Sequence, residues 1–106
     1  MTNMDDRRKG FENKFAHDAE LQFRVEARRN HLLGEWAADL LGKEGEEKAA
    51  YARDVVRSDF ETAGDDDVMR KVSGDLAEKV PAAEIRAKMD MLMEQAKLQI
   101  MREQTS

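Results

Sequence analysis

The stretch LQFRVEARRNHLLGEWAADLLG, residues 21–42, carries apolar side chains at a helical spacing. Five of them follow one another in steps of four and seven: Leu21, Val25, Leu32, Trp36 and Leu40. Such steps return to the same side of an α-helix, so these residues form one apolar face. The stretch therefore predicts an amphipathic helix with one side toward a core.

The sequence before this stretch also favours helix. From Asp5 to Leu41 only Gly10 and Gly34 interrupt a series of helix-favouring residues. Gly42 suits the position just after a helix end, because glycine adopts the left-handed conformation found there without strain. We therefore predict a long first helix that ends at Gly42.

Residues 43–64 predict a second helix. The sequence KEGEE, residues 43–47, suits a turn followed by the acidic first turn of a helix. Apolar residues then recur every three or four positions, at Ala49, Ala52, Val56, Phe60 and Ala63. Gly64 is expected to close this helix.

Two further helices are predicted between residues 65 and 100. The three aspartates at 65–67 offer an N-cap and negative charge for the start of a short helix, which ends near Lys79. Pro81 suits the first turn of the last helix. The polar C-terminal end of that helix is expected to fray. The apolar stripe of that helix is Ile85, Met89, Leu92, Met93, Ala96 and Ile100. The predicted fold class is all-α, a four-helix bundle with a long first helix.

Composition limits the class of protein. A chain of 106 residues is long enough for one domain with a modest core. It contains no cysteine, which excludes disulfide and thiolate chemistry. Its apolar runs are too short to span a membrane, and its acidic start does not resemble a targeting signal. Because the net charge is −5, we expect no nucleic-acid binding, and we expect no direct membrane insertion.

The sequence offers little for catalysis, metals or cofactors. None of the three serines stands in the signature of an activated nucleophile. His17 and His31 are fourteen residues apart, about 21 Å along a continuous helix, so they cannot share a metal ion there. The aspartates at 65–67 lack the spacing of a calcium loop, and no GxxxxGKS phosphate loop is present. We expect no enzyme activity, no metal and no cofactor.

Four methionines near the C-terminus allow two interpretations. Met89, Met91, Met93 and Met101 could line an adaptable peptide groove, because their side chains are flexible. Met89 and Met93, however, fall in the apolar stripe of the last predicted helix, which favours a place in the core.

The stretch GFENKFAHD, residues 10–18, is the candidate partner-binding surface. Steps of four from Phe11 and Phe15 lead to Ala19 and Phe23, whereas the core stripe begins at Leu21. At 100° per residue the two stripes differ by about half a turn, so they cannot face one core on a straight helix. Either a break near residues 16–19 lets both phenylalanines cap the bundle, or they anchor an amphipathic helix in a groove on a partner. Sequence physics leaves both interpretations open.

Several longer segments resemble one known family. FENKFAHDAEL, EARRNHLLGEWAADLLGK, DFETAGDDDV and IRAKMD, in this order, are similar to the zeta subunit of alphaproteobacterial F-type ATP synthases. The resemblance covers nearly the whole chain. It implies a four-helix protein that inhibits ATP hydrolysis by the catalytic head of the synthase. In such a protein the N-terminal segment enters an interface between alpha and beta subunits, reaches the gamma shaft and blocks rotation.

Carried over by position, the resemblance implies an inhibitory segment at residues 1–19 and a bundle at residues 20–106. The segment would be mobile, and disordered or loosely helical, when free. The implied partner-binding residues are Asp5, Asp6, Arg7, Arg8, Phe11, Glu12, Lys14, Phe15, His17 and Asp18. The implied partners are the alpha, beta and gamma subunits, and the free chain is expected to be a monomer. It would be cytoplasmic and peripheral to the inner membrane through the synthase.

Two positions depart from the family pattern. Gly10 stands where relatives often have a better helix former, so ordering the segment costs about 1 kcal/mol more and inhibition should be weaker than in the best members. AEKVPAAEIR, residues 77–86, has Pro81 in place of the usual Ser or Asp cap.

Two other functions remain as alternatives. One is a helical adaptor that binds a peptide through its methionine-bearing surface. The other is a bundle that senses adenine nucleotides, since weak ATP or ADP binding is also implied for the family, at a site that the sequence does not place.

Overall fold

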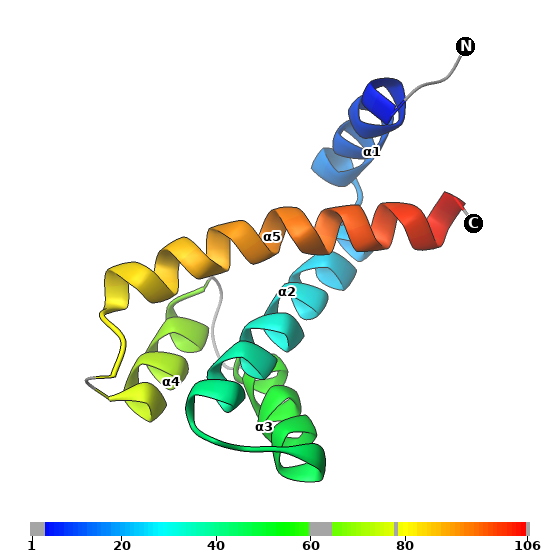
Figure 1. Cartoon of the computed structure of the whole chain (residues 1–106). Coiled ribbons are helices and arrows are strands. Elements are labelled where there is room, and N and C mark those ends of the chain that lie inside the picture. Colours follow the sequence, from blue (N-terminus) through cyan, green and yellow to red (C-terminus); the bar gives the residue numbers. More distant parts are fainter. Residues whose placement is uncertain (1–3, 60–64, 78, 106) are drawn as a thin grey trace.

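The computed structural model describes residues 4–59, 65–77 and 79–105, with side chains from Asp6 to Gln104 within these ranges. Five helices lie in this described part (Figure 1): α1 (Met4–His17), α2 (Ala19–Leu40), α3 (Gly45–Ser58), α4 (Asp66–Leu76) and α5 (Ala82–Thr105). The all-α prediction is confirmed. The prediction of a four-helix bundle is not confirmed, because the expected first helix is divided and five helices are counted in the described residues.

The division falls at Asp18. Its backbone is extended, with φ −114° and ψ 103°, and its side chain accepts a hydrogen bond from the Leu21 amide at 3.1 Å. An aspartate in this position caps the helix that follows it, because it satisfies one of the free amides of the first turn. The break lies within residues 16–19, as in the first of the two interpretations that the change of phase between the apolar stripes left open. At the other end of α2, Gly42 has φ 76°, as expected for a glycine after a helix.

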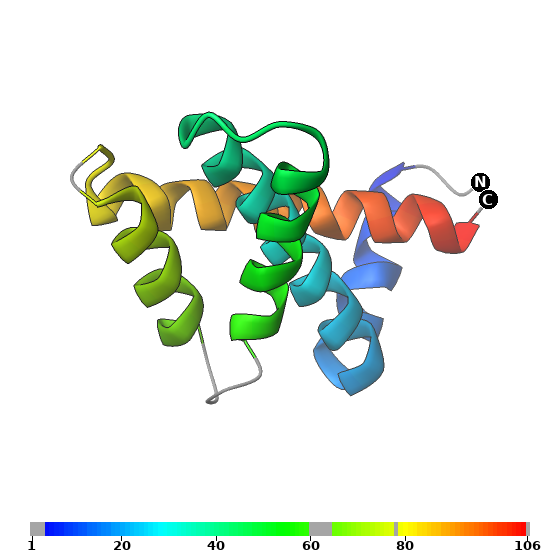
Figure 2. The ribbon, with the colours of Figure 1, turned by 90° about the horizontal axis from the view of Figure 1, so that it is seen from below.

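α2 lies at the centre of the fold. It packs along α3 and crosses α5, while α4 lies beside the N-terminal half of α5 (Figures 1 and 2). We call α2–α5 the helical body. Its hydrophobic core includes Leu33, Val55, Val72, Leu76 and Ile85. α1 lies at the other end of this elongated molecule, beside the C-terminal half of α5.

The buried face of α2 differs in part from the predicted one. Leu40 was expected in the core but is 42% exposed. Steps of four from the buried Val25 lead instead to Arg29, Leu33 and Ala37, all of them buried. The prediction followed only apolar residues, and therefore passed over a face that contains an arginine.

Arg29 can be buried because the carboxylate of Asp65, just before α4, pairs with its positive charge. Its terminal nitrogens donate to the Asp65 carboxylate at 2.8 and 3.2 Å, and its Nε donates to the Asn30 side chain at 3.0 Å. Asp65 stands at the N-cap position of α4 but makes no capping hydrogen bond with its side chain. The predicted cap is therefore wrong for Asp65, because its carboxylate binds a buried guanidinium that would be costly to leave unpaired.

Two of the central helices end earlier than predicted. α3 ends at Ser58, and the predicted continuation through residues 60–64 lies outside the described residues. Val55 rather than Val56 is the fully buried valine of this helix. α4 ends at Leu76, because Ala77 takes a φ of 51°, which a helix cannot accommodate.

α5 begins beside Pro81, as predicted. The carbonyl of Pro81, just before the helix, accepts hydrogen bonds from the amides of Glu84 and Ile85. The helix continues to Thr105, where fraying was expected. Glu103 in its last turns binds Arg28 of α2 through two contacts of 2.7 and 2.9 Å, and this hydrogen bonding lowers the pKa of Glu103. A bidentate pair of this kind holds the end of α5 against α2.

Glu26 gives the stability a pH dependence. Burial raises the pKa of Glu26, with Arg29 opposing and Asp59 and Asp65 adding to the shift. A raised pKa means that the folded chain binds this proton more tightly, so the stability from this group is lost as pH rises through the folded pKa. We expect Glu26→Gln to raise the melting temperature at pH 7 by about 1–3 °C and to change it little at pH 4.

The control for this prediction is Glu35→Gln on the same helix, measured by circular dichroism melting at both pH values. Glu35 is also partly exposed but lies 3.7 Å from His31, so its removal reports a carboxyl with a basic neighbour for comparison with Glu26. An equal gain for both variants at pH 7, or a gain for Glu26→Gln that persists at pH 4, would contradict the prediction.

Candidate functional site

The composition of α1 favours a helix, and the helix ends just before Asp18. Its last turn contains Lys14 and His17, and basic residues near a C-terminus interact favourably with the helix dipole. Its only disfavoured interior residue is Gly10, which faces open space. The extended backbone of Asp18 then turns the chain into α2. α1 is therefore a separate helix joined to the helical body by one non-helical residue.

Phe11 fixes α1 to the helical body. The side chain is 7% exposed and belongs to a second hydrophobic cluster, with Leu21, Val25, Ala96, Ile100 and Met101. These residues come from α2 and from the C-terminal half of α5. Burying a phenylalanine side chain in this way favours the packed position of α1 by roughly 1.5–3 kcal/mol.

Phe15 supports the same contact at the edge of the cluster. Its ring stacks on Phe11 at 6.3 Å between centroids with an interplanar angle of 18°. The side chain of Gln22 donates a hydrogen bond to the Phe15 carbonyl at 2.7 Å, which ties the last turn of α1 to α2. This bond satisfies one of the carbonyls that a helix end leaves without an intrahelical partner.

Lys97 of α5 contacts α1 in two ways. Its ammonium lies 4.7 Å from the centroid of the Phe15 ring, a cation–π distance, and 3.4 Å from the Glu12 carboxylate. Glu94, one turn earlier on α5, lies 3.7 Å from the same ammonium. The Lys97 side chain is only 16% exposed, so these contacts are partly shielded from water.

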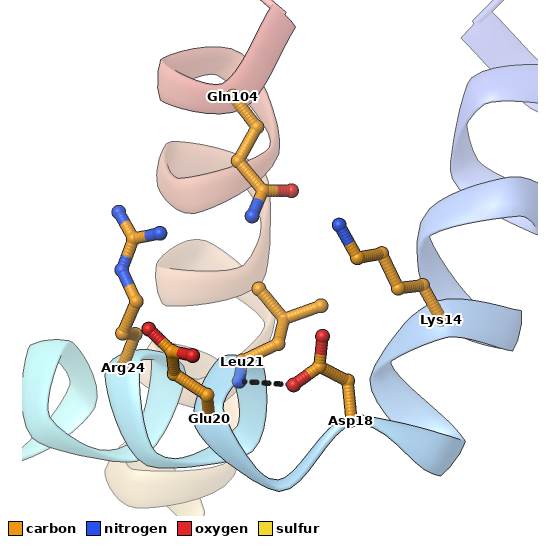
Figure 3. Close-up of a pocket in the computed structure, with 6 residues that line it drawn as sticks. All are labelled: Lys14, Asp18, Glu20, Leu21, Arg24 and Gln104. Atoms are coloured by element: carbon orange, nitrogen blue, oxygen red, sulfur yellow. Dashed lines mark hydrogen bonds between the residues drawn. The ribbon is translucent and has the colours of Figure 1, made fainter.

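Two neighbouring clefts lie along one side of α1 where it meets the helical body. One, of about 210 Å³, is lined by Lys14, Asp18, Glu20, Leu21, Arg24 and Gln104. In Figure 3 the Lys14 ammonium points across this cleft toward Gln104, and the Asp18 cap on Leu21 closes its base. The other, of about 190 Å³, is lined by Arg7, Gly10, Phe11, Lys14, Met101 and Gln104. On this side of α1, open space therefore separates part of the helix from the body.

The residues predicted to bind a partner fall into three groups. Asp6, Arg7, Arg8, Lys14 and His17 are exposed. Glu12, Phe15 and Asp18 are half-buried, and Phe11 is buried. Asp5 lies in α1, but its side chain is outside the described set. The structure thus brings the two phenylalanines onto the helical body, as the first interpretation of GFENKFAHD required, and leaves most of the charged residues open to solvent.

Sequence reasoning placed most of the apolar residues that receive α1 in the predicted stripes but missed Lys97 and Gln22. Lys97 and Met101 continue the i, i+4 row from Met93, so the row itself was a signal. Gln22 had no such signal, because its role depends on the angle between α1 and α2. The methionine groove of the adaptor alternative loses support, since Met89 and Met101 are buried and only Met91, 50% exposed, is open among the four.

The sequence also predicted no metal site and no membrane insertion. In the described part of the chain, no group of three or more His, Asp or Glu residues is arranged to hold a metal ion. His31 lies 3.7 Å from Glu35 on its own helix, and His17 is exposed at the end of α1. None of the described helices is both long enough and apolar enough to cross a membrane.

These features define a small helical protein whose N-terminal helix contacts the body mainly through Phe11 and its neighbours. A family model described as ATPase inhibitor subunit zeta matches residues 1–99. The chain therefore belongs to this family of ATPase inhibitor subunits, and the resemblance noted in the sequence is confirmed. Membership supports a regulatory role on ATP synthase rather than an enzyme.

The fold is also similar to a solved structure. A protein whose structure was determined by solution NMR is 59% identical to this chain, with a TM-score of 0.74. The match covers 78% of this chain and 98% of the other. A search of curated proteins found no match.

Proposed function

We propose that this protein inhibits ATP hydrolysis by F-type ATP synthase by inserting α1 into an interface between alpha and beta subunits, near the gamma shaft. The observation that carries the proposal is the separation of α1 from the helical body at Asp18, in a chain of the zeta inhibitor family. A helix joined through a single extended residue can be presented to a partner while α2 keeps its cap.

The composition of α1 supports this role. Phe11 and Phe15 are one turn apart, the spacing by which an amphipathic helix anchors in a groove. Arg7, Arg8 and Lys14 are exposed around them and can bind carboxylates on a partner. Buried aromatic side chains with an outer ring of charged residues are typical of high-affinity contacts.

The mechanism needs no reactive group. A helix wedged in an interface that must open and close during catalysis stops the cycle mechanically. The strength of inhibition then depends on how well the aromatic anchors fit the groove and on the free energy spent in ordering α1. The helical body would act as the stop that limits how far α1 enters.

Photo-crosslinking tests the proposed location. A photo-activatable amino acid in place of Lys14 is expected to form covalent products with the alpha and beta subunits of a purified catalytic head, in step with the loss of ATP hydrolysis. The same amino acid in place of Arg70, exposed on α4, is the control and should give few or no such products. Inhibition accompanied by crosslinks from position 70 only would contradict insertion of α1.

A further inference from the structure

The same aromatic residues serve two surfaces. Phe11 is 7% exposed where α1 packs on α2 and α5, and the proposed function requires this side chain in a groove on the synthase. One side chain cannot be buried in both places at once. Packing of α1 on the helical body and binding of α1 to a partner therefore exclude each other.

The contact that holds α1 on the helical body is small. Among the described side chains of α1, Phe11 is the only buried one. Clefts of about 210 and 190 Å³ lie along one side of the contact, so this side of α1 lacks the close packing that holds a core helix. The helices of the body, by contrast, share a larger cluster of buried residues. α1 can thus detach while the body stays folded.

The hinge for this movement is Asp18. Its carboxylate caps α2 through the Leu21 amide, and neither of these residues belongs to α1. The cap is kept when α1 swings away. Detachment of α1 breaks the contacts of Phe11, the hydrogen bond from Gln22 to the Phe15 carbonyl and the two contacts of Lys97.

We propose that packing of α1 on the helical body is a closed, self-inhibited state, and that Lys97 of α5 sets its population. The inference rests on the proposed function of α1. For a partner that binds only the open state, the apparent association constant is the intrinsic one multiplied by the fraction of chains that are open. A chain that is open about one tenth of the time inhibits about ten-fold more weakly than one that is always open.

Lys97 is the residue to test, because both of its contacts to α1 come from one side chain that the helical body does not need for its core. Lys97→Ala removes the cation–π contact with Phe15 and the ion pair with Glu12. We expect half-maximal inhibition of ATP hydrolysis at a concentration two- to five-fold lower, roughly the effect of losing one such pair of contacts. Amide hydrogen exchange in α1 of the free protein should accelerate by a similar factor.

Lys88→Ala is the matched control. Lys88 lies on the same helix and also contacts an aromatic ring, that of Trp36 at 5.8 Å, but it does not touch α1. It should change neither the inhibition nor the exchange of α1. Lys97→Arg, which keeps the positive charge, should behave like the unaltered chain.

The two readouts separate this inference from the function on which it rests. Unchanged exchange and unchanged inhibition for Lys97→Ala would overturn the closed state, as would faster exchange with weaker inhibition. If the unaltered chain does not inhibit at all, the proposed function fails as well. If it inhibits but Lys97→Ala does not inhibit better, only the closed state is wrong.

Discussion

A chain with Phe11→Ala and Phe15→Ala is expected to inhibit ATP hydrolysis at least about 30-fold more weakly than the unaltered chain. Aromatic anchors at the centre of an interface each contribute roughly 2 kcal/mol or more. Part of this loss is recovered, because Phe11 is already buried in the free chain and its removal also weakens packing on the body. The measurement is a titration of a purified catalytic head with each protein at fixed ATP concentration.

A chain that begins at Asp18 marks complete loss of α1 and is the reference for this titration. It keeps the cap on the Leu21 amide, so α2 is not weakened at its start. Circular dichroism melting should show a folded helical body in both variants, since its larger core cluster contains no residue of α1. Inhibition by the double variant equal to that of the unaltered chain would show that the phenylalanines are not the anchors.

The sequence predicted the helices better than their contacts. Periodicity indicated which segments are helical but joined α1 and α2 into one helix, and the mismatch of phase between Phe11 and Leu21 left a break near residues 16–19 as one of two interpretations. It did not predict that Arg29 would be buried, because the partner that makes this possible, Asp65, is 36 residues away. The pairing of Glu103 with Arg28 near the end of α5 was not predicted for the same reason, since the two residues are 75 positions apart.

The candidate site could be predicted only on one side. Residues 10–18 stood out because their aromatic stripe had no place on a straight core helix. The apolar residues that receive this segment were in the predicted stripes, but nothing in the sequence assigned them or Lys97 to it, because they meet it only after the chain turns at Asp18. A sequence pattern describes the faces of a helix, whereas the choice of which two faces meet depends on the angle at the break.

At Gly34, the close approach of α2 to α3 determines which faces of these two helices meet. A Cβ added there would lie 2.7 Å from the Cα of Ala52 on α3 and 3.2 Å from the Cβ of Val55. The nearer atom is backbone, so it cannot move unless α3 shifts away from α2. Overpacking costs about 1–3 kcal/mol, and alanine recovers up to about 1 kcal/mol through its higher helix propensity.

Gly34→Ala is therefore expected to lower the melting temperature by up to about 10 °C, whereas Gly74→Ala should raise it by up to about 5 °C. Gly74 also lies inside a helix, but a Cβ added there meets no atom within 4 Å. The same substitution thus changes sign with packing alone, and circular dichroism melts of both variants measure it. Stabilisation by Gly34→Ala would mean that α2 and α3 are not in this contact. Because neither glycine touches α1, both variants should inhibit like the unaltered chain at temperatures where they are folded, which separates the integrity of the helical body from the action of α1.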